Sequence, residues 1–280
     1  MSLPTTNRLH VRQVGDVVAY TFPLLDAIPF VRHGFSTRLG GVSQGIFSSM
    51  NLSFTRGDDE RAVRENFRLF CEAVGVSPDR VVVSAQEHHT NIYNATAADC
   101  GRGVTRERGY TDIDGLLTDE PGVVLCTQYA DCVPLFFADP VRRVVGTSHS
   151  GWKGTVARIG AVTVERMCRD YGCRRGGIIA AVGPSIGPCC FEVDEPVYEA
   201  FHTMEEWDDA CARVRPGRKF DIDLWEINRR ILLKAGIREE HLDVTDLCTK
   251  CHPDVFWSHR VTGKERGSLA GLIAMASDGK

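Results

Sequence analysis

The chain has 280 residues, of which 43% are hydrophobic and 25% charged, with a formal net charge of -4. This composition is typical of a globular protein and lacks the basic excess that a nucleic-acid partner or an anionic membrane would require. No apolar stretch approaches the roughly 20 residues that span a bilayer, and the N-terminus lacks the order of a signal peptide, so we expect a cytoplasmic protein without a membrane partner.

The chain is expected to form one domain. It contains no internal repeat, no low-complexity tract and no linker rich in proline and serine. A chain of this length buries roughly three-quarters of its unfolded surface, so it needs neither a disulfide nor a metal merely to fold. We therefore expect residues 1–280 to form a single domain, with about the first eight residues as a loose end.

The first predicted element is a helix over residues 58–74. Apolar residues recur from Val63 to Val74 at the spacing of one helix face. An aspartate at either of the first two positions can cap the N-terminus, and Gly75 ends the helix.

The later elements alternate less regularly. Short apolar runs predict strands, and 3.6-residue periodicity predicts helices. The predicted strands are 81–83, 123–126, 133–137, 144–147, the apolar part of 176–190, and 254–260, and the predicted helices are 154–169 and 223–236. Asp223, three residues before Glu226, is typical of a capping box. Because strands and helices alternate only in the middle, we expect an α+β fold with mixed β-sheets flanked by helices.

The eleven cysteines are many for a cytoplasmic protein, but their odd number and the chain length favour free thiols. Most free cysteines are small buried apolar residues. Cys248 and Cys251 are spaced as C-T-K-C, whereas Cys189 and Cys190 are adjacent. A structural zinc site needs two well-spaced pairs, and adjacent side chains tend to diverge. We therefore expect neither a zinc site nor a redox pair from these four.

Three residues that commonly bind metals each follow a predicted strand: His88, Cys132 and His149. Side chains at strand ends converge at one sheet edge, so the three form a plausible zinc site with an open fourth position, as in catalytic zinc sites. The spacing is no local metal motif, and buried structural roles fit these residues as well. Without a metal, Cys132 would be a nucleophile, His149 its base and Asp131 an orienting group.

Two cations are candidates for binding phosphate. Arg38 lies in STRLGGVSQG, residues 36–45, where backbone amides and a guanidinium suit an anion, although the stretch is also typical of a surface turn. Lys153 lies in HSGWKGT, where glycines let the chain turn after a strand. Trp152 beside it would either stack on a planar base or pack in the core.

Eight stretches, in one order from about residue 30 to 275, match the motifs of a known family. They are HGFSTRLGGVSQG, NLS, QEHHT, DGLLTDEPGVVLCTQYADCVPLFFADP, HSGWKGT, GPSIGPCCFEV, FDIDLWEINRRILLKAGI and CTKCHPDVFWSHRVTG. Together they resemble the bacterial purine nucleoside phosphorylase/peptidoglycan editing factor family, formerly called multicopper polyphenol oxidases or laccase-domain proteins. The resemblance implies an α+β fold and a metal site whose ligands fall on His88, Cys132 and His149.

Two positions depart from the family motifs without removing a ligand. His89 stands where the family's Q-x-H-G has glycine, which adds a second nitrogen beside His88. Near the C-terminus, Glu265 precedes Arg266 where glycine is usual.

The resemblance implies a purine nucleoside enzyme that uses zinc or, alternatively, copper. The family is credited with phosphorolysis of adenosine, inosine, guanosine and methylthioadenosine to free base and ribose 1-phosphate, and with deamination of adenosine. The partners would then be small nucleosides and phosphate. The metal would activate water or polarise a substrate oxygen. Asp131 or His89 would move protons, and Arg38 and Lys153 would hold phosphate.

Other classes of function stay open. The family name suggests a peptidoglycan editing hydrolase that removes L-serine from a UDP-MurNAc precursor at the same metal site. A copper polyphenol oxidase would need histidines clustered around several coppers, whereas the nine in this chain are scattered. A metal-free Cys–His hydrolase and a non-enzymatic binding protein complete the alternatives.

Overall fold

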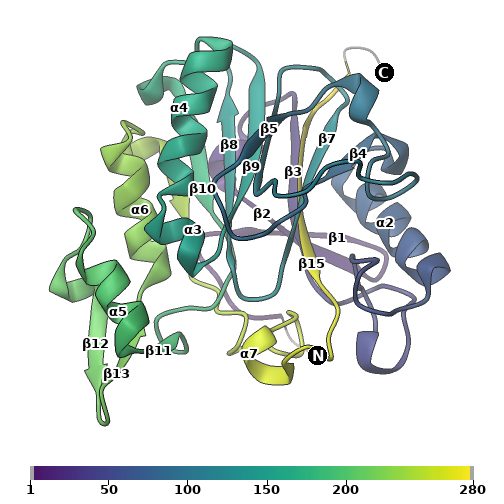
Figure 1. Cartoon of the computed structure of the whole chain (residues 1–280). Helices are drawn as coiled ribbons and strands as arrows, with labels where there is room; N and C mark the ends of the chain where they lie inside the picture. Colours follow the sequence, from purple (N-terminus) through teal and green to yellow (C-terminus); the bar gives the residue numbers. More distant parts are fainter. Residues whose placement is uncertain (1–2, 278–280) are drawn as a thin grey trace.

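Two six-stranded β-sheets stack face to face within residues 3–277, the part of the chain that the computed structural model describes. Helices cover the outer faces of both sheets, with α4 and α6 on one side and α2 on the other (Figure 1). The predicted α+β class, a single compact domain with mixed sheets flanked by helices, is confirmed.

The strands run both parallel and antiparallel in each large sheet. The first sheet has the order β1 (His10–Val14), β2 (Val17–Thr21), β3 (Val31–Ser36), β15 (Leu269–Met275), β7 (Val124–Tyr129), β4 (Val81–Val83). The second has the order β14 (Leu242–Val244), β10 (Ile179–Val182), β8 (Val133–Asp139), β9 (Val144–Ser150), β6 (Gly115–Thr118), β5 (Ile92–Asn94). A small third sheet has the order β11 (Glu192–Asp194), β13 (Lys219–Ile222), β12 (Ala212–Arg215).

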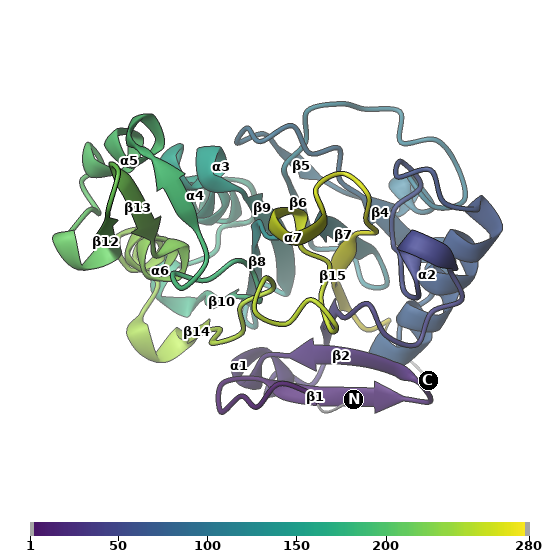
Figure 2. The same cartoon turned by 90° about the horizontal axis from the view of Figure 1, so that it is seen from below.

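The helices differ widely in length. They are α1 (Pro23–Asp26), α2 (Glu60–Val74), α3 (Trp152–Val156), α4 (Ile159–Tyr171), α5 (Glu195–His202), α6 (Leu224–Lys234) and α7 (His259–Thr262). Figure 2 views the molecule from below and shows α7 lying across that end of the sheets. None of the helices in the described part of the chain is long and apolar enough to cross a membrane.

The side chains of β8 show why the domain has four layers. Val133, Leu135 and Phe137 pack with the helices outside the second sheet. Phe136 and Ala138, at the alternate positions, pack between the two sheets. This period of two places apolar side chains on both faces, as expected for a strand buried on each side. Burying such a large apolar side chain contributes roughly 1.5–3 kcal/mol, so the sheets form a stiff base for the loops at their ends.

The predicted ends of two helices are confirmed. Asp59 accepts a hydrogen bond from the backbone N–H of Arg61, and Gly75 ends α2 in the left-handed conformation that favours glycine, with φ of 82°. Asp223 accepts the backbone N–H groups of Trp225 and Glu226 at the start of α6. The carboxylate of Glu226 bonds to arginines of α6 instead of reaching back, so the structure shows only half of the capping box.

The single helix predicted over 154–169 is wrong, because the chain breaks into α3 and α4. Arg158 between them adopts a left-handed conformation with φ of 58°. Its guanidinium lies 3.0 Å from the carboxylate of Glu206, an almost fully buried acid. The ion pair fixes the bend that helical periodicity alone does not reveal.

The strand predicted over 254–260 is also wrong. Residues 254–258 are turns and irregular structure that lead into α7, which includes residues 259 and 260, and Trp257 is buried with its indole N–H donating to the carbonyl of Met50. The last strand of the chain is β15, which lies between β3 and β7 and was not predicted. At the other end, residues 1 and 2 of the expected loose segment lie outside the described residues, and Thr6 donates a hydrogen bond to Asp246.

Candidate metal centre and substrate cavity

His88, Cys132 and His149 lie together at one end of the two sheets. His88 follows β4, Cys132 directly precedes β8, and His149 is the penultimate residue of β9, one position inside the strand. The potential ligand atoms of the three residues lie within 4.8 Å of one another. The imidazole rings of His88 and His149 meet edge to face, with their centroids 4.7 Å apart. The three side chains therefore converge at the strand ends, as the sequence predicts.

A fourth residue, Asp114, organises the cluster; it opens the motif DGLLTDEPG but is not among the site residues predicted from the sequence. Its carboxylate, fully buried just before β6, accepts the Nδ1–H of His149 at 2.8 Å. It also accepts the backbone N–H groups of Glu87, His88 and His89 at 2.9–3.1 Å. One carboxylate thus fixes the loop that carries His88 and the ring orientation of His149. Because Nδ1 of His149 is engaged, Nε2 is the nitrogen left for a metal.

The contacts within the cluster favour the charged forms of Asp114 and His149, as their pKa shifts show. Burial raises the pKa of an aspartate, but the hydrogen bonds from His149 and the backbone outweigh burial and lower the pKa of Asp114. Burial lowers the pKa of a histidine, but the charges and hydrogen bonds of Cys132 and Asp114 prevail and raise the pKa of His149 to about 9. Burial, followed by the nearby His149, lowers the pKa of His88.

Gly151 explains part of the HSGWKGT turn. A Cβ at this position would lie 2.5 Å from Nδ1 of His88 and 3.2 Å from Sγ of Cys132. The φ of Gly151 is -64°, which any residue adopts, so the glycine is required for space rather than for backbone freedom. The turn thus lets α3 begin directly against the cluster.

Two hollows meet at the cluster and share His88 and Cys132 in their linings. The smaller hollow has a volume of about 180 Å³ and a mostly polar lining that includes Gln86, Gln128 and Arg108. The larger hollow has a volume of about 630 Å³, within the range of small-molecule pockets. Its lining combines apolar side chains with cationic ones: Trp152, Ile186, Phe191, Leu224, His259, Arg260 and Lys264.

Arg266 and Arg56 line both hollows. Arg266 is 6% exposed, and its Nε has no hydrogen-bond partner among the described residues. Burial, and then the charge of Arg56, lower the pKa of Arg266 to about 10. A buried guanidinium with an unused donor beside a second arginine is well suited to bind an anion.

The other predicted site residues lie in different surroundings. Arg38 stacks on Trp257 at 3.7 Å and donates to the carbonyls of Ser48 and Pro253, and it is not among the described residues that line the two hollows. Lys153 is exposed, with Nζ 5.7 Å above the ring of Trp152.

The two candidates for proton transfer are both hydrogen-bonded. The ring of His89 is exposed, and its Nδ1 lies 2.6 Å from the carboxylate of Asp112. Asp131 lines the larger hollow, but its carboxylate accepts hydrogen bonds from Thr249, Ser258 and the backbone N–H of Arg260 at 2.6–3.0 Å.

The donor set of the cluster fits zinc. Two imidazole nitrogens and one thiolate are zinc ligands, and three protein ligands leave a fourth position for water or substrate. The carboxylate of Asp114 behind His149 is the partner that metal-binding histidines usually have. Of the nine histidines, only His88 and His149 belong to a potential metal-binding group in the described residues.

Known proteins share both the sequence and the fold. The pattern of the family described as multi-copper polyphenol oxidoreductase laccase matches residues 32–276. The chain is 35% identical over 243 residues to the purine nucleoside phosphorylase YlmD of Bacillus subtilis, which covers 86% of this chain and 87% of that protein. It is 34% identical over 238 residues to the adenosine deaminase RL5 of an unknown prokaryotic organism, which covers 83% and 90%. The solved structure of the hypothetical protein YfiH of Bacillus licheniformis superimposes with a TM-score of 0.89 at 31% identity, over 96% of this chain and 100% of that chain.

Proposed function

Since the chain belongs to the family described as multi-copper polyphenol oxidoreductase laccase, we propose that it is a zinc-dependent purine nucleoside phosphorylase that also deaminates adenosine, as the names of its relatives suggest. Its substrates would be adenosine, inosine, guanosine and methylthioadenosine. The observation that carries the proposal is the position of His88, Cys132 and His149 at the junction of a small polar hollow and a larger one with aromatic and aliphatic walls. A nucleoside has the same division, between a planar base and a polar sugar.

The larger hollow is the proposed site for the base. Trp152 and Phe191 offer aromatic faces for stacking, and Ile186 and Leu224 exclude water from the base. Trp152 also packs partly against the core, in line with the packing role considered for it from the sequence, whereas its stacking on the base is part of this proposal.

The phosphate is proposed to lie against Arg266 and Arg56. These two arginines line both hollows, whereas Arg38 lines neither and donates to the backbone carbonyls of Ser48 and Pro253. Bidentate guanidinium contacts hold phosphate in a fixed orientation. Orientation of this kind accelerates a displacement at the anomeric carbon, because the nucleophile is already in place.

His88, Cys132 and His149 would hold the zinc, which supplies Lewis acidity or a lowered water pKa when bound. Asp114 keeps the Nδ1 proton of His149 in place. Because both carboxylate oxygens of Asp131 already accept hydrogen bonds, we assign Asp131 to positioning of the cavity wall rather than to proton transfer.

His259 is the proposed proton donor to the departing base. It lines the larger hollow, and its Nδ1–H donates to the carbonyl of Gly263 at 2.8 Å, so in the doubly protonated ring the Nε2–H would be the proton passed to the base. Replacing it (His259→Asn) should lower kcat for phosphorolysis without changing the zinc content. An unchanged kcat would remove His259 from this role.

The deciding experiment is turnover of adenosine by purified, zinc-loaded protein, followed by chromatography of the products. We expect adenine and ribose 1-phosphate only when phosphate is present, and inosine with or without phosphate. Cys132→Ala should abolish all three products, whereas Cys168→Ala, at a cysteine on α4 that lines neither hollow, should not. Zinc-loaded wild type that forms none of these products would refute the proposal. Full activity after metal removal would instead favour the metal-free Cys–His hydrolase.

The peptidoglycan-editing alternative is supported by the cationic lining of the cavity. Arg56, Arg260, Lys264 and Arg266 suit the diphosphate of a UDP-MurNAc precursor as well as free phosphate. Release of L-serine from such a precursor, at a rate above that of nucleoside turnover, would favour this alternative. A copper polyphenol oxidase has less support, because two histidines and one cysteine cannot hold several coppers.

A further inference from the structure

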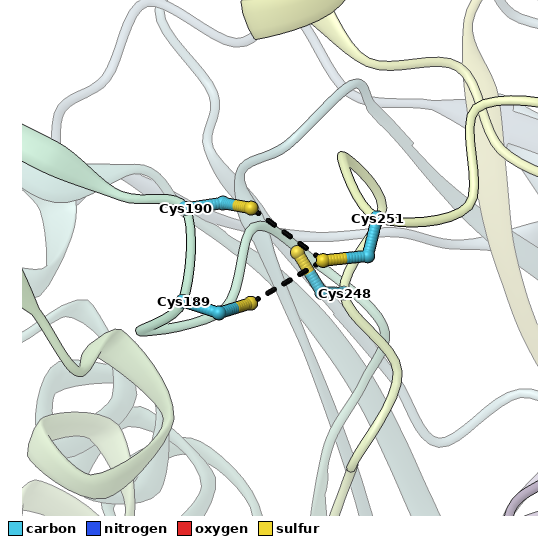
Figure 3. Close-up of side chains that lie close together, drawn as sticks. All are labelled: Cys189, Cys190, Cys248 and Cys251. Carbon is cyan, nitrogen blue, oxygen red and sulfur yellow. Dashed lines mark hydrogen bonds between the residues drawn. The ribbon is translucent and has the colours of Figure 1, made fainter.

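Four cysteines from two loops form a second cluster outside the substrate cavity. Cys189 and Cys190 lie in the loop between β10 and β11, and Cys248 and Cys251 lie in the loop that follows β14. The four sulfur atoms lie within 4.8 Å of one another. Figure 3 shows the side chains pointing toward a common centre, with the Sγ of Cys251 within hydrogen-bond distance of both members of the adjacent pair.

The strand pairing explains how the two loops meet. β10 and β14 are parallel neighbours, so the segments that follow them leave the same edge of the sheet. The backbone of Ser185 pairs with that of Cys248, and Thr249 donates its N–H to the carbonyl of Ser185 at 2.9 Å. Sequence spacing could not reveal this convergence, because the pairs are about 60 residues apart.

The expected divergence of the adjacent pair is wrong for this loop. Cys190 and Phe191 both donate their backbone N–H groups to the carbonyl of Gly187, at 2.9 and 3.0 Å, which curls the chain tightly. The Sγ atoms of Cys189 and Cys190 then lie 3.4 and 3.5 Å from Sγ of Cys251. Both sulfurs of the adjacent pair therefore face the same partner.

The sulfur spacing matches a metal site better than a disulfide or simple packing. A disulfide requires an S–S distance of about 2.05 Å, and all the cysteines of the chain are free. In a tetrahedral site with Zn–S bonds of about 2.3 Å, sulfur atoms are about 3.8 Å apart. Cys189 and Cys251 are exposed, whereas cysteines that act only as packing residues are usually buried.

Gly187 gives a second, independent indication. Its backbone N–H donates to Sγ of Cys248 at 3.2 Å, a contact that stabilises the thiolate a metal requires. A Cβ at this position would lie 3.2 Å from Cβ of Cys248 and 2.7 Å from the ring of Trp225. The absence of a side chain lets the loop approach the sulfur this closely.

We propose that Cys189, Cys190, Cys248 and Cys251 bind one zinc ion in a closed structural site, separate from the cluster at His88. On binding, the four thiols release four protons to solvent, and the ion has no open position for substrate. The ion joins two walls of the larger hollow, because Ile186 and Phe191 belong to one loop and His259 and Arg260 follow the other. Its role is to hold these two loops in fixed positions relative to each other.

The test measures metal in full-length protein purified under reducing conditions, in a Cys132→Ala background that disables the first cluster. We expect about one zinc per chain in this variant and about two in the wild type. Co²⁺ bound to Cys132→Ala should give an intense thiolate-to-metal charge-transfer band. Adding Cys251→Ser should remove the zinc and the band, whereas the control Cys168→Ser should keep both.

A measurement on zinc-loaded Cys132→Ala itself covers the case in which Cys251→Ser does not fold. X-ray absorption at the zinc edge should show four sulfur neighbours. Neighbours that are mainly nitrogen or oxygen, no retained metal, or a disulfide between Cys189 and Cys251 in reduced preparations would overturn the proposal. These readouts do not involve nucleoside turnover, so they stand or fall independently of the proposed enzyme activity.

Discussion

Asp114→Asn is the sharpest perturbation of the candidate metal centre, because it changes one atom at the point where four donors meet. One carboxylate oxygen accepts from the backbone of His88 and from Nδ1 of His149, and the other accepts from the backbone of Glu87 and His89. An asparagine has only one acceptor oxygen. Whichever way the amide turns, its NH₂ group faces two donors and two of the four hydrogen bonds are lost.

The expected cost falls on metal affinity. If the amide faces His149, the imidazole must carry its proton on Nε2, where it blocks a metal ion. Loss of such an outer partner typically weakens metal binding 10–100-fold, which corresponds to about 1.4–2.7 kcal/mol. The metal-free protein should also lose about 1–3 kcal/mol of unfolding free energy, because buried donors are left unpaired.

The assay is a competition titration of zinc against a chromogenic chelator, with Asp112→Asn as the matched control. Asp112 is only two residues away but bonds to His89 and Asn91 at the surface. The control should bind zinc as the wild type does. A zinc affinity of Asp114→Asn within twofold of the wild type would refute the argument that this carboxylate orients His149.

Three further predictions concern the space beside Gly151, the binding of phosphate and the pH dependence of stability. Gly151→Ala places a Cβ 2.5 Å from Nδ1 of His88 and should lower zinc affinity at least ~10-fold. Gly177→Ala, whose added Cβ would lie 3.9 Å from Cβ of Arg174, should leave the affinity unchanged; equal affinities of the two variants in the same titration would contradict the steric reasoning. Arg266→Met should raise the KM for phosphate about 10-fold or more. Arg38→Met should leave that KM unchanged and lower the melting temperature. A raised KM in Arg38→Met and an unchanged KM in Arg266→Met would indicate that Arg38 binds the phosphate instead. The hydrogen bond from Arg169, with those from Asn94 and Arg166, lowers the pKa of Asp170 well below its usual 3.8, so its stabilisation is present above that value and is lost as the pH falls. Urea unfolding should therefore show Asp170→Asn to be about 0.5–1 kcal/mol less stable at neutral pH. The difference should begin to narrow as the pH falls below 3.8 and close only as the pH falls through the lowered folded-state pKa; a difference that stays constant as the pH falls from about 5 to about 2 would exclude this cause.

The proximity of His88, Cys132 and His149 could be predicted because each residue stands at the end of an apolar strand, and apolar runs are the strongest signal in the sequence. Asp114 could not, because it is 35 residues from His149 along the chain and no periodicity marks it. The same limit applies to the arginine pair, since Arg56 and Arg266 meet only after β15 inserts between β3 and β7. Local hydrophobic patterns predict helices and strands. The partners of buried polar side chains depend instead on how the strands are ordered in the sheets.

The predictions of one helix over 154–169 and of a strand over 254–260 fail for a different reason. Both segments have a local pattern that fits a regular element, and in both a tertiary polar contact overrides it. Arg158 leaves the helical conformation to pair with Glu206. Trp257, in an apolar run that resembles a strand, is held instead by the carbonyl of Met50 and the guanidinium of Arg38. Tertiary hydrogen bonds and ion pairs outweigh local preferences of a few tenths of a kcal/mol.

Asp131 connects the two cysteine-containing clusters through a single residue. Its neighbour in the chain is Cys132 of the metal centre, and its carboxylate accepts from Thr249, the residue after Cys248 of the four-cysteine cluster. Its backbone carbonyl accepts the N–H of Ile186, in the loop that leads to Cys189. Any shift of the outer loops therefore acts on the backbone that positions Cys132. The ion proposed for the four cysteines would therefore be linked, through Asp131, to the position of Cys132 in the cavity wall.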